Sequence, residues 1–471
     1  MLTNQISFER IYNIRPTLVH SNLINLRKYR FKTTNQVNPS FSKTRIPEDV
    51  LEDVKEYLKE NHKELVRESF GNKEKKEELS LLISEYISSK EFLEKYQESV
   101  ETFQHDELVD LLVDSIAGLD VLEELLKIPT ITDININSYD DIWVDDYQVG
   151  PYKTNIKFES RQAYEAVLNK LINQAGVSWS VKSPQISGAL PNLRFDIVGF
   201  DISEKITTSL RIFAKELRIS EESLVQTGQA SEQMVKFLKL LMKVNAKILV
   251  SGPTGSGKTE LIKLLIGFIP DHKRIISIED LKELMLKELY PNKNIAEWLT
   301  RVNVNSDDPD WDYGELIRVA MRHYPKWLVI GECRGPEVYH MIKSGQTGHN
   351  FISSIHASDA QEQIDRMIAL MHEFAPGDDH VYGQRLTQNI NVGIHLERIG
   401  KNQQRTITKI VEFIGYENKK PIYNTLFEYN REKGIHVFKS AMSDRLYKLF
   451  VSEGINLDDI SFMLPKQTIT A

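Results

Sequence analysis

Cysteine is almost absent from this sequence, since Cys333 is the only one among 471 residues. A single cysteine excludes an intrachain disulfide framework, which fits a reducing cytosol, and we expect Cys333 to be a small buried side chain. No apolar stretch approaches the ~18–20 residues of a membrane-spanning helix. The first residues, Met1 to Ser7, lack the basic region and apolar core of a secretory signal. The sequence therefore predicts a cytoplasmic protein whose membrane contact is peripheral.

An excess of positive charge is also lacking, because the formal net charge at pH 7 is −8. Bulk attraction to nucleic acid is therefore not predicted, although a local basic patch is compatible with this charge. We find no internal repeats, no low-complexity segment, and no cysteine pair or His-x-x-x-His spacing of the kind that binds metals. The hydrophobic share of 41% is typical of a soluble globular protein, and the length predicts about three domains.

One short stretch carries the clearest chemical signal. The apolar run Ile248 to Val250 is followed by residues that fit the phosphate-loop pattern G-x-x-x-x-G-K-[ST]. Glycines let backbone N–H groups surround a polyphosphate, the lysine places a cation at the β/γ oxygens, and the last hydroxyl serves Mg²⁺. Apolar residues at helical spacing follow, so the motif has its strand and its helix. The predicted nucleotide-binding residues are Gly252, Pro253, Thr254, Gly255, Ser256, Gly257, Lys258 and Thr259.

Changes of pattern divide the chain into four parts. A polar, basic arm is followed by a helical module, in which Val50, Val54 and Leu58 recur at spacing four. After Pro129, alternating apolar residues predict a hairpin and further strands of a small α/β domain, which a polar linker at 219–231 follows. The predicted parts are the helical module with its arm (1–105), the α/β domain and linker (106–225), the phosphate-loop domain (226–430) and a C-terminal extension (431–471).

Strands and helices alternate after residue 233, which predicts a parallel sheet with crossover helices. The fold class is therefore α/β. Two later segments, 391–397 and 405–414, are predicted as antiparallel additions to this sheet, and a short strand and helix follow at 435–438 and 444–451. Ligands of such sheets lie at the carboxyl ends of the strands. The phosphate loop, several acids and His356 all fall at those ends.

Acidic residues at strand ends are candidates for magnesium binding and water activation. Glu332 ends an apolar strand, and its alternative role is to be paired with Arg334. The group Glu279, Asp280 and Glu283 ends another strand, and one of its carboxylates could orient the attacking water, although any one of them could form a structural salt bridge instead. His356 follows a third strand, beside the predicted γ-phosphate, while a packed or solvated histidine is the competing interpretation.

These motifs resemble those of the secretion ATPase superfamily of type II and type IV secretion and of type IV pili, and most closely the branch of Tad-type pili and conjugation. The phosphate loop resembles its Walker A motif, Ile278–Leu284 its Asp box, Leu328–Gly335 its Walker B motif, and Gln346–Ala357 its His box. Upstream, Leu190–Arg194 and Leu210–Phe213 resemble its arginine-bearing strands, so the resemblance covers about 105–440.

The resemblance implies a RecA-like core, preceded by the small α/β domain, in a homohexamer that hydrolyses ATP with Mg²⁺. It implies an inner-membrane secretion or pilus platform protein as partner, peripheral membrane contact and no direct nucleic-acid binding. Glu283 is then the preferred catalytic carboxylate, ahead of Glu279, while His356 senses the γ-phosphate. Glu332 and Thr259 hold the Mg²⁺ shell. Arg194 and Arg211 reach the phosphates from the preceding domain and couple its closure to hydrolysis.

The sequence departs from the family pattern in three places. Glu260 stands where the family usually repeats threonine, Pro325-Lys326-Trp327 replaces the usual Pro-Asp, and the first ~100 residues match no motif. Two alternative functions stay open, namely a RecA-like motor that translocates nucleic acid and a nucleotide-gated scaffold without turnover. DNA-stimulated hydrolysis would favour the first, and ATP binding without phosphate release the second.

Overall fold

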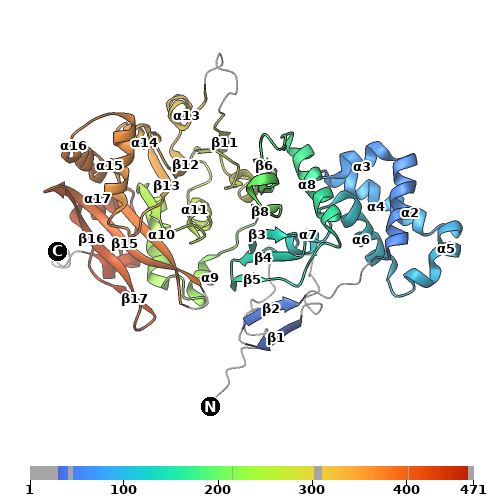
Figure 1. Cartoon of the computed structure of the whole chain (residues 1–471). Helices are drawn as coiled ribbons and strands as arrows, with labels where there is room; N and C mark the ends of the chain where they lie inside the picture. The colour runs from blue at the N-terminus through green and yellow to red at the C-terminus, as the bar shows by residue number, and fades with distance from the viewer. Residues whose placement is uncertain are drawn as a thin grey trace. The chain divides into compact units, whose positions relative to one another are not determined.

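The computed structural model describes residues 30–34, 36–40, 46–214, 216–301, 310–400 and 403–464. The chain forms two compact units (Figure 1). Among the described residues, no helix is long and apolar enough to cross a membrane. Unit 1 comprises Met1–Glu123, Ile136–Trp143 and Tyr152–Val167, and unit 2 comprises Glu124–Asn135, Val144–Pro151 and Leu168–Ala471.

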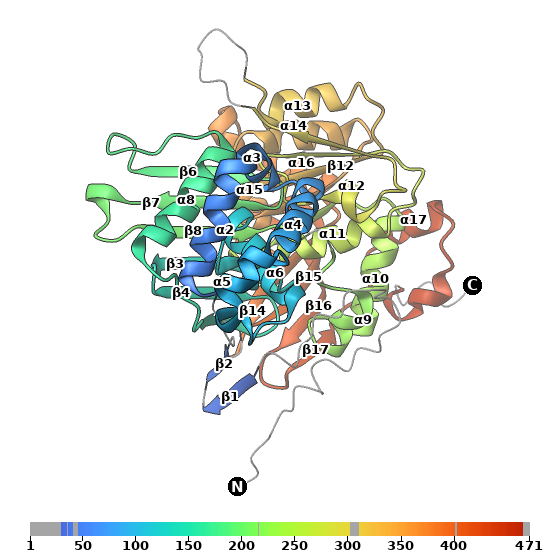
Figure 2. The ribbon, with the colours of Figure 1, turned by 90° about the vertical axis from the view of Figure 1, so that its right-hand side faces the viewer.

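Unit 1 is built on a helical core, as the apolar spacing predicted. Val50, Val54 and Leu58 are all buried, together with Leu79 and Ile83 of α4. Helix α4 contacts α3, α5 and α6 (Figure 2). Of the predicted arm, only the antiparallel strands β1 (Arg30–Thr34) and β2 (Gln36–Ser40) lie within the described residues. The helices are α2 (Glu48–Asn61), α3 (Lys63–Ser69), α4 (Lys73–Ile87), α5 (Lys90–Val100) and α6 (His105–Ala117).

A six-stranded sheet has the order β5-β4-β3-β8-β7-β6. The predicted hairpin and the two later strands are all present in it, whereas the short strands β5 and β6 were not predicted. In the register between β7 and β8, Arg194 lies directly opposite Arg211. The strands are β3 (Ile131–Ser138), β4 (Asp141–Asp146), β5 (Gly150–Lys153), β6 (Gln185–Leu190), β7 (Leu193–Val198) and β8 (Thr207–Ile212), accompanied by α7 (Leu122–Leu126) and α8 (Arg161–Ala175).

The main sheet of unit 2 has nine strands in the order β11-β10-β12-β13-β9-β14-β15-β16-β17. The first six strands in this order, β11, β10, β12, β13, β9 and β14, are all parallel to their neighbours within this group, which confirms the predicted parallel sheet. One expectation was wrong, because β14 runs parallel to β9 and is antiparallel only to β15. The strands are β9 (Ile248–Ser251), β10 (Ile275–Glu279), β11 (Ile295–Leu299), β12 (Trp327–Cys333), β13 (Asn350–Ile355), β14 (Val392–Ile399), β15 (Gln404–Glu417), β16 (Lys420–Asn430) and β17 (Ile435–Phe438).

Helices cover both faces of this sheet. Within β9, Ile248 and Val250 pack toward α10, α11 and α17, whereas Leu249 packs toward α13 to α16 on the opposite face. Figure 1 shows α14, α15 and α16 grouped together. Because both faces are buried, the central strands β9, β10 and β12 are mainly apolar, as parallel strands usually are. The helices are α10 (Glu232–Lys243), α11 (Lys258–Gly267), α12 (Leu286–Leu289), α13 (Tyr313–Ala320), α14 (Glu337–Gln346), α15 (Gln363–Phe374), α16 (Asp379–Asn389) and α17 (Asp444–Ser452).

The polar stretch predicted as a linker contains a short helix, α9 (Glu221–Gln226). Ser220 and Ser223 form a reciprocal cap at its start, in which each side chain accepts from the other residue's backbone N–H. Ile219 and Leu224 are buried in the core of unit 2. The helix was not predicted because its serine and glutamate residues occur both at helix starts and in loops, so the sequence pattern was ambiguous.

Candidate nucleotide site

The phosphate loop connects β9 to α11, as its motif predicted. Gly255 and Gly257 adopt φ values of +73° and +98°, which side-chain-bearing residues rarely take. Lys258 folds back over the loop, and its Nζ donates to the carbonyls of Gly252 at 2.7 Å and Pro253 at 3.2 Å. Burial lowers the pKa of Lys258 to about 8, against the opposing effect of Glu332. The ammonium group is therefore placed inside the loop, where a bound anion would stabilise its charged form.

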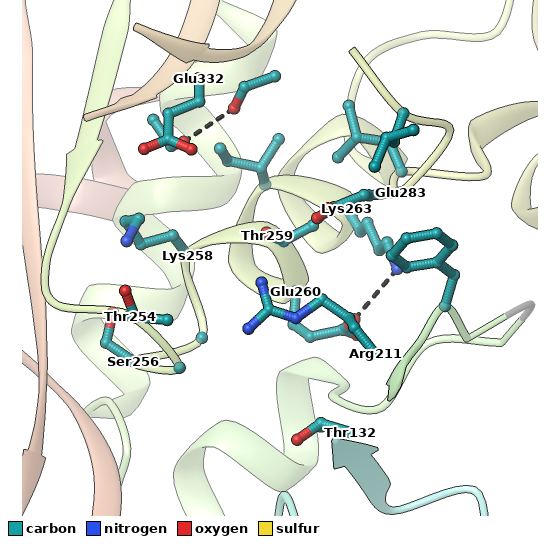
Figure 3. A pocket seen from close by; sticks show the side chains of 18 of the residues that line it. Thr132, Arg211, Thr254, Ser256, Lys258, Thr259, Glu260, Lys263, Glu283 and Glu332 are labelled. Atoms are coloured by element: carbon teal, nitrogen blue, oxygen red, sulfur yellow. Dashed lines mark hydrogen bonds and ion pairs between the residues drawn. The ribbon is translucent and has the colours of Figure 1, made fainter. Parts of the chain in front are cut away.

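A cavity of about 250 Å³ adjoins this loop, and every residue that lines it belongs to unit 2. Figure 3 shows Lys258 and Glu332 on one side of the pocket, with Arg211 facing it from another. Gly252 and Pro253 are the only predicted site residues outside the lining. The predicted residues that line it are Arg194, Arg211, Thr254, Gly255, Ser256, Gly257, Lys258, Thr259, Glu279, Asp280, Glu283, Glu332 and His356.

Glu332 lies on β12 with one carboxylate oxygen paired and the other available. Its Oε2 accepts from Arg334 Nε at 2.8 Å and Nη2 at 2.5 Å. The pairing with Arg334, which was the alternative interpretation of Glu332, is therefore present. Its buried Oε1 lies 2.9 Å from Nε2 of His356, but the ring is not oriented to donate, so this oxygen has no hydrogen bond within the described residues. Burial and Lys258 lower the pKa of His356, so the imidazole is neutral near pH 7.

Glu279 and Glu283 differ in what their carboxylates contact. Glu279 is only 3% exposed, and its Oε1 accepts from the backbone N–H groups of Leu284 at 2.9 Å and Glu283 at 3.2 Å. Burial raises the pKa of Glu279 to about 8. Burial also raises the pKa of Glu283, although Arg211 and Arg194 oppose it. Glu279 thus holds the turn that carries Glu283, whose carboxylate faces the arginines.

The two upstream arginines line the same cavity from neighbouring strands. Arg211 Nε donates to Asp133 Oδ1 at 2.9 Å. Burial lowers the pKa of Arg211, but Asp133 and Glu283 outweigh this effect and leave it above its ordinary value. The arrangement can place two positive charges at an anion bound to the loop, and Asp133 fixes the direction of one of them.

Sequence reasoning missed a buried ionic cluster beside the loop helix. Glu260, flagged only as a departure from the family pattern, pairs through Oε1 with Lys263 Nζ at 3.1 Å and Arg218 Nη1 at 3.4 Å. The guanidinium also donates to the carbonyls of Pro129, Ile131 and Ile212 at 3.1 to 3.2 Å. The Glu260–Lys263 pair has a local i,i+3 spacing, but no local pattern could have indicated Arg218, which lies 42 residues from Glu260.

Cys333 and His349, the other histidine of the segment that resembles the His box, lie outside the cavity lining. His349 contacts Thr347 Oγ1 at 3.1 Å, at the end of β13 opposite to His356. Cys333 is 3% exposed, which confirms its expected burial. Burial raises the pKa of its thiol, so it is not a reactive thiolate.

The donor set fits a magnesium ion. The unbonded Oε1 of Glu332 and the hydroxyl of Thr259 are oxygen donors on the same cavity. Mg²⁺ in nucleotide sites takes one or two protein oxygens and completes its shell with phosphates and water. Among the described residues there is no cluster of three His, Cys, Asp or Glu side chains that would hold a metal by protein ligands alone.

Strand β13 separates β9, which precedes the phosphate loop, from β12, which carries Glu332. This order, with crossover helices on both faces, defines the RecA-like class of P-loop nucleotide-binding folds. Residues 185–442, more than half of the chain, match the family model described as type II/IV secretion system protein. The chain belongs to this family, and the predicted resemblance to the secretion ATPase superfamily is confirmed.

The chain is also similar to individual proteins and to solved structures. An uncharacterised protein of Bacillus anthracis is 28% identical over 430 residues, which span 89% of this chain and 92% of that protein. The type IV secretion system protein VirB11 of Bartonella quintana is 34% identical over 168 residues, 35% of this chain and 45% of VirB11. The crystal structure of the pilus retraction motor PilT with bound ADP has a TM-score of 0.44 at 17% identity and covers 74% of this chain and 98% of that one.

Proposed function

We propose that this protein hydrolyses ATP with Mg²⁺ and uses the resulting domain motion to power type IV secretion, as in conjugation, or the assembly of a Tad or type IV pilus. One observation carries the proposal. The phosphate loop, Glu283, Glu332, His356 and the arginine pair of β7 and β8 line one cavity, although they span residues 194–356 of the chain. Membership of the type II/IV secretion family supports the proposal that ATP hydrolysis is coupled to transport.

We assign the roles as follows. Lys258 and the loop N–H groups bind the β- and γ-phosphates, and Glu283 orients the attacking water and accepts its proton. Thr259 and Glu332 hold Mg²⁺, which when bound neutralises charge that develops on the phosphate oxygens. His356, as a neutral imidazole, donates to the γ-phosphate and so distinguishes ATP from ADP. Arg211, aligned by Asp133, and Arg194 offset transition-state charge when their sheet closes over the loop.

The working assembly in this proposal is a homohexamer in the cytoplasm, bound peripherally to the cell membrane through a platform protein. Residues 1–105 are our candidate for the surface that docks on it. The support comes from relatives, among them VirB11 of Bartonella quintana and a putative conjugal transfer protein of Mycobacterium tuberculosis, 27% identical over 271 residues. Mass photometry of the full chain with and without Mg-ATP tests the hexamer directly.

Phosphate release by purified protein tests the enzymatic proposal. Lys258→Ala should lower ATP turnover by about 100-fold or more, since it removes the cation at the transferred phosphate. Lys243→Ala makes the same change at an exposed position on α10 and should leave turnover unaltered. Full turnover by the Lys258 variant, or background turnover by the wild-type hexamer, would refute the proposal.

A further inference from the structure

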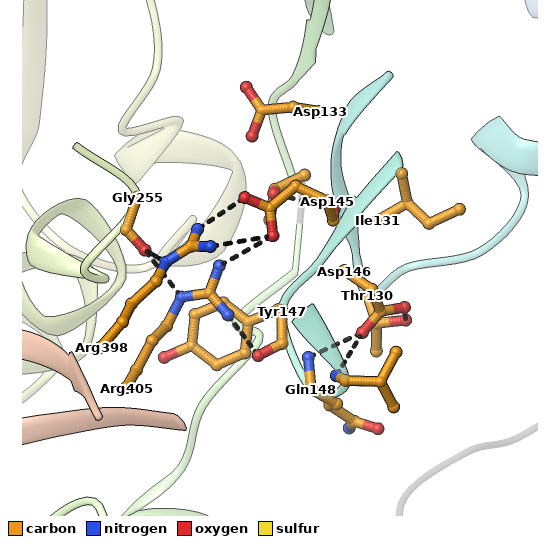
Figure 4. Close-up of polar contacts among 12 residues, drawn as sticks. Thr130, Ile131, Asp133, Asp145, Asp146, Tyr147, Gln148, Gly255, Arg398 and Arg405 are labelled. Carbon is orange, nitrogen blue, oxygen red and sulfur yellow. Dashed lines mark hydrogen bonds and ion pairs between the residues drawn. The ribbon is translucent and has the colours of Figure 1, made fainter. Parts of the chain in front are cut away.

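A pair of arginines contacts a backbone carbonyl of the phosphate loop, and one of them, Arg405, also lines the cavity. Arg398 on β14 and Arg405 on β15 are direct cross-strand partners. The Nε of each donates to the carbonyl oxygen of Gly255 at 2.9 Å (Figure 4). One carbonyl in the middle of the loop therefore receives two charged hydrogen bonds from a hairpin more than 140 residues later in the chain.

Two guanidinium groups opposite each other on neighbouring strands repel one another unless an anion lies between them. Asp145 of β4 is that anion. Its Oδ2 lies 2.6 Å from Arg398 Nη2, and its Oδ1 lies 3.8 Å from Arg405 Nη2. Arg405 also donates to the carbonyl of Tyr147 and stacks on its ring at 4.1 Å. The three charged side chains are at most 19% exposed, so solvent screens them little.

The peptide group between Gly255 and Ser256 is consequently fixed at both ends. Its carbonyl is bound by the two arginines, and its N–H donates to the carbonyl of Pro253 at 3.2 Å. The packing is close, because a Cβ on Gly255 would lie 2.3 Å from Arg398 Nη2. A Cβ on Gly252 would meet the carbonyl of Leu396, on the same hairpin, at 2.2 Å. The hairpin therefore determines the shape of the loop, and Asp145 determines the placement of the arginines.

We propose that Arg398 and Arg405 are positioning residues that preorganise the phosphate loop for nucleotide, and that Asp145 links the loop to the strand β4. The inference rests on the proposed function only in taking a nucleotide as the ligand of the loop. Arg398 holds Gly255 and Asp145 at once, so a shift of the segment 144–151 is transmitted to the loop through one side chain.

Binding of the fluorescent nucleotide MANT-ADP with Mg²⁺ to the full chain tests the proposal without requiring turnover. Arg398→Gln should weaken binding by about 10- to 100-fold, as expected for the loss of charged hydrogen bonds that preorganise the loop. Arg431→Gln is the matched control, because Arg431 pairs with Glu397 at 2.7 Å on the same sheet without touching the loop. Binding by Arg398→Gln at wild-type affinity would overturn the proposal.

Two further variants separate the loop contact from the ion pair. Asp145→Asn leaves both arginines in place but uncompensated, and should weaken MANT-ADP binding while the circular dichroism spectrum stays unchanged. The charge exchange Asp145→Arg with Arg398→Asp restores an ion pair but removes the Arg398 hydrogen bond to Gly255 and leaves only that of Arg405, so nucleotide affinity should stay below that of wild type. Recovery of affinity by the exchange would show that only the ion pair matters and would contradict our assignment. Absence of phosphate release by wild type would refute the ATPase proposal while leaving this binding test intact.

Discussion

The buried cluster around Glu260 makes a quantitative prediction for Glu260→Gln. This substitution keeps the shape of the side chain and removes its charge. Glu260 is 7% exposed, and its partners Arg218 and Lys263 are 8% and 2% exposed, so two buried cations would lose their only counter-charge in the cluster. Breaking a buried ion pair from one side costs about 3–5 kcal/mol. We expect about 3 kcal/mol, because Arg218 keeps its three carbonyl acceptors.

Urea unfolding, followed by tryptophan fluorescence, measures this effect. With an m value of about 3 kcal/mol/M, the midpoint of Glu260→Gln should fall by about 1 M. The double variant Glu260→Gln with Lys263→Met removes one uncompensated cation, so its midpoint should lie above that of the single variant. Glu221→Gln is the control, since Glu221 pairs with Lys239 at a shorter distance of 2.7 Å but is 36% exposed. Exposed pairs contribute about 0–1 kcal/mol.

Two outcomes would refute this reasoning. The first is a loss for Glu260→Gln no greater than that for Glu221→Gln, which would mean that burial of the cluster is irrelevant to its strength. The second is a double variant less stable than the single one, which would mean that Lys263 contributes through packing and not through charge.

Two predictions concern the acids of the cavity. Glu283→Gln should lower turnover by about 10²- to 10⁴-fold while MANT-ADP affinity is retained, and equal losses in both would contradict a role in water activation. The folded protein should bind one more proton at Glu279 than the unfolded chain between pH 4.5 and about 8, because the pKa is raised in the fold. Stability contributed by Glu279 is therefore lost as pH rises through this window, and urea midpoints of Glu279→Gln measured from pH 5 to 9 should fall less steeply than those of wild type.

The parts of the fold that sequence predicted are those with local signals. The phosphate loop, its strand and its helix follow from a contiguous motif. The strands that carry Glu279 and Glu332, and the strand that His356 follows, are predicted by apolar runs bounded by polar residues. The direction of β14 was predicted wrongly, because a pairing partner cannot be read from one strand. The crossover through α16 returns the chain parallel to β9.

The residues that sequence missed act across long separations. Arg398 and Arg405 follow the loop residue that they bind by 143 and 150 positions. An arginine in a β-hairpin has no local feature that distinguishes a loop contact from a solvated side chain. Glu260 was noticed as a departure from the family, but its distant partner Arg218 emerged only from the packed structure.

The position of β13 between β9 and β12 determines the distance that a ligand must span between the phosphate loop and Glu332. Neighbouring strands lie about 4.8 Å apart, so the strand that leads into the phosphate loop and the strand that carries Glu332 are separated by about twice that distance. His356, just beyond β13, stands at the intermediate step. The carboxyl ends of these three strands are thus spaced at regular intervals of one strand separation. The length of a bound phosphate chain therefore determines how many strand ends it can contact.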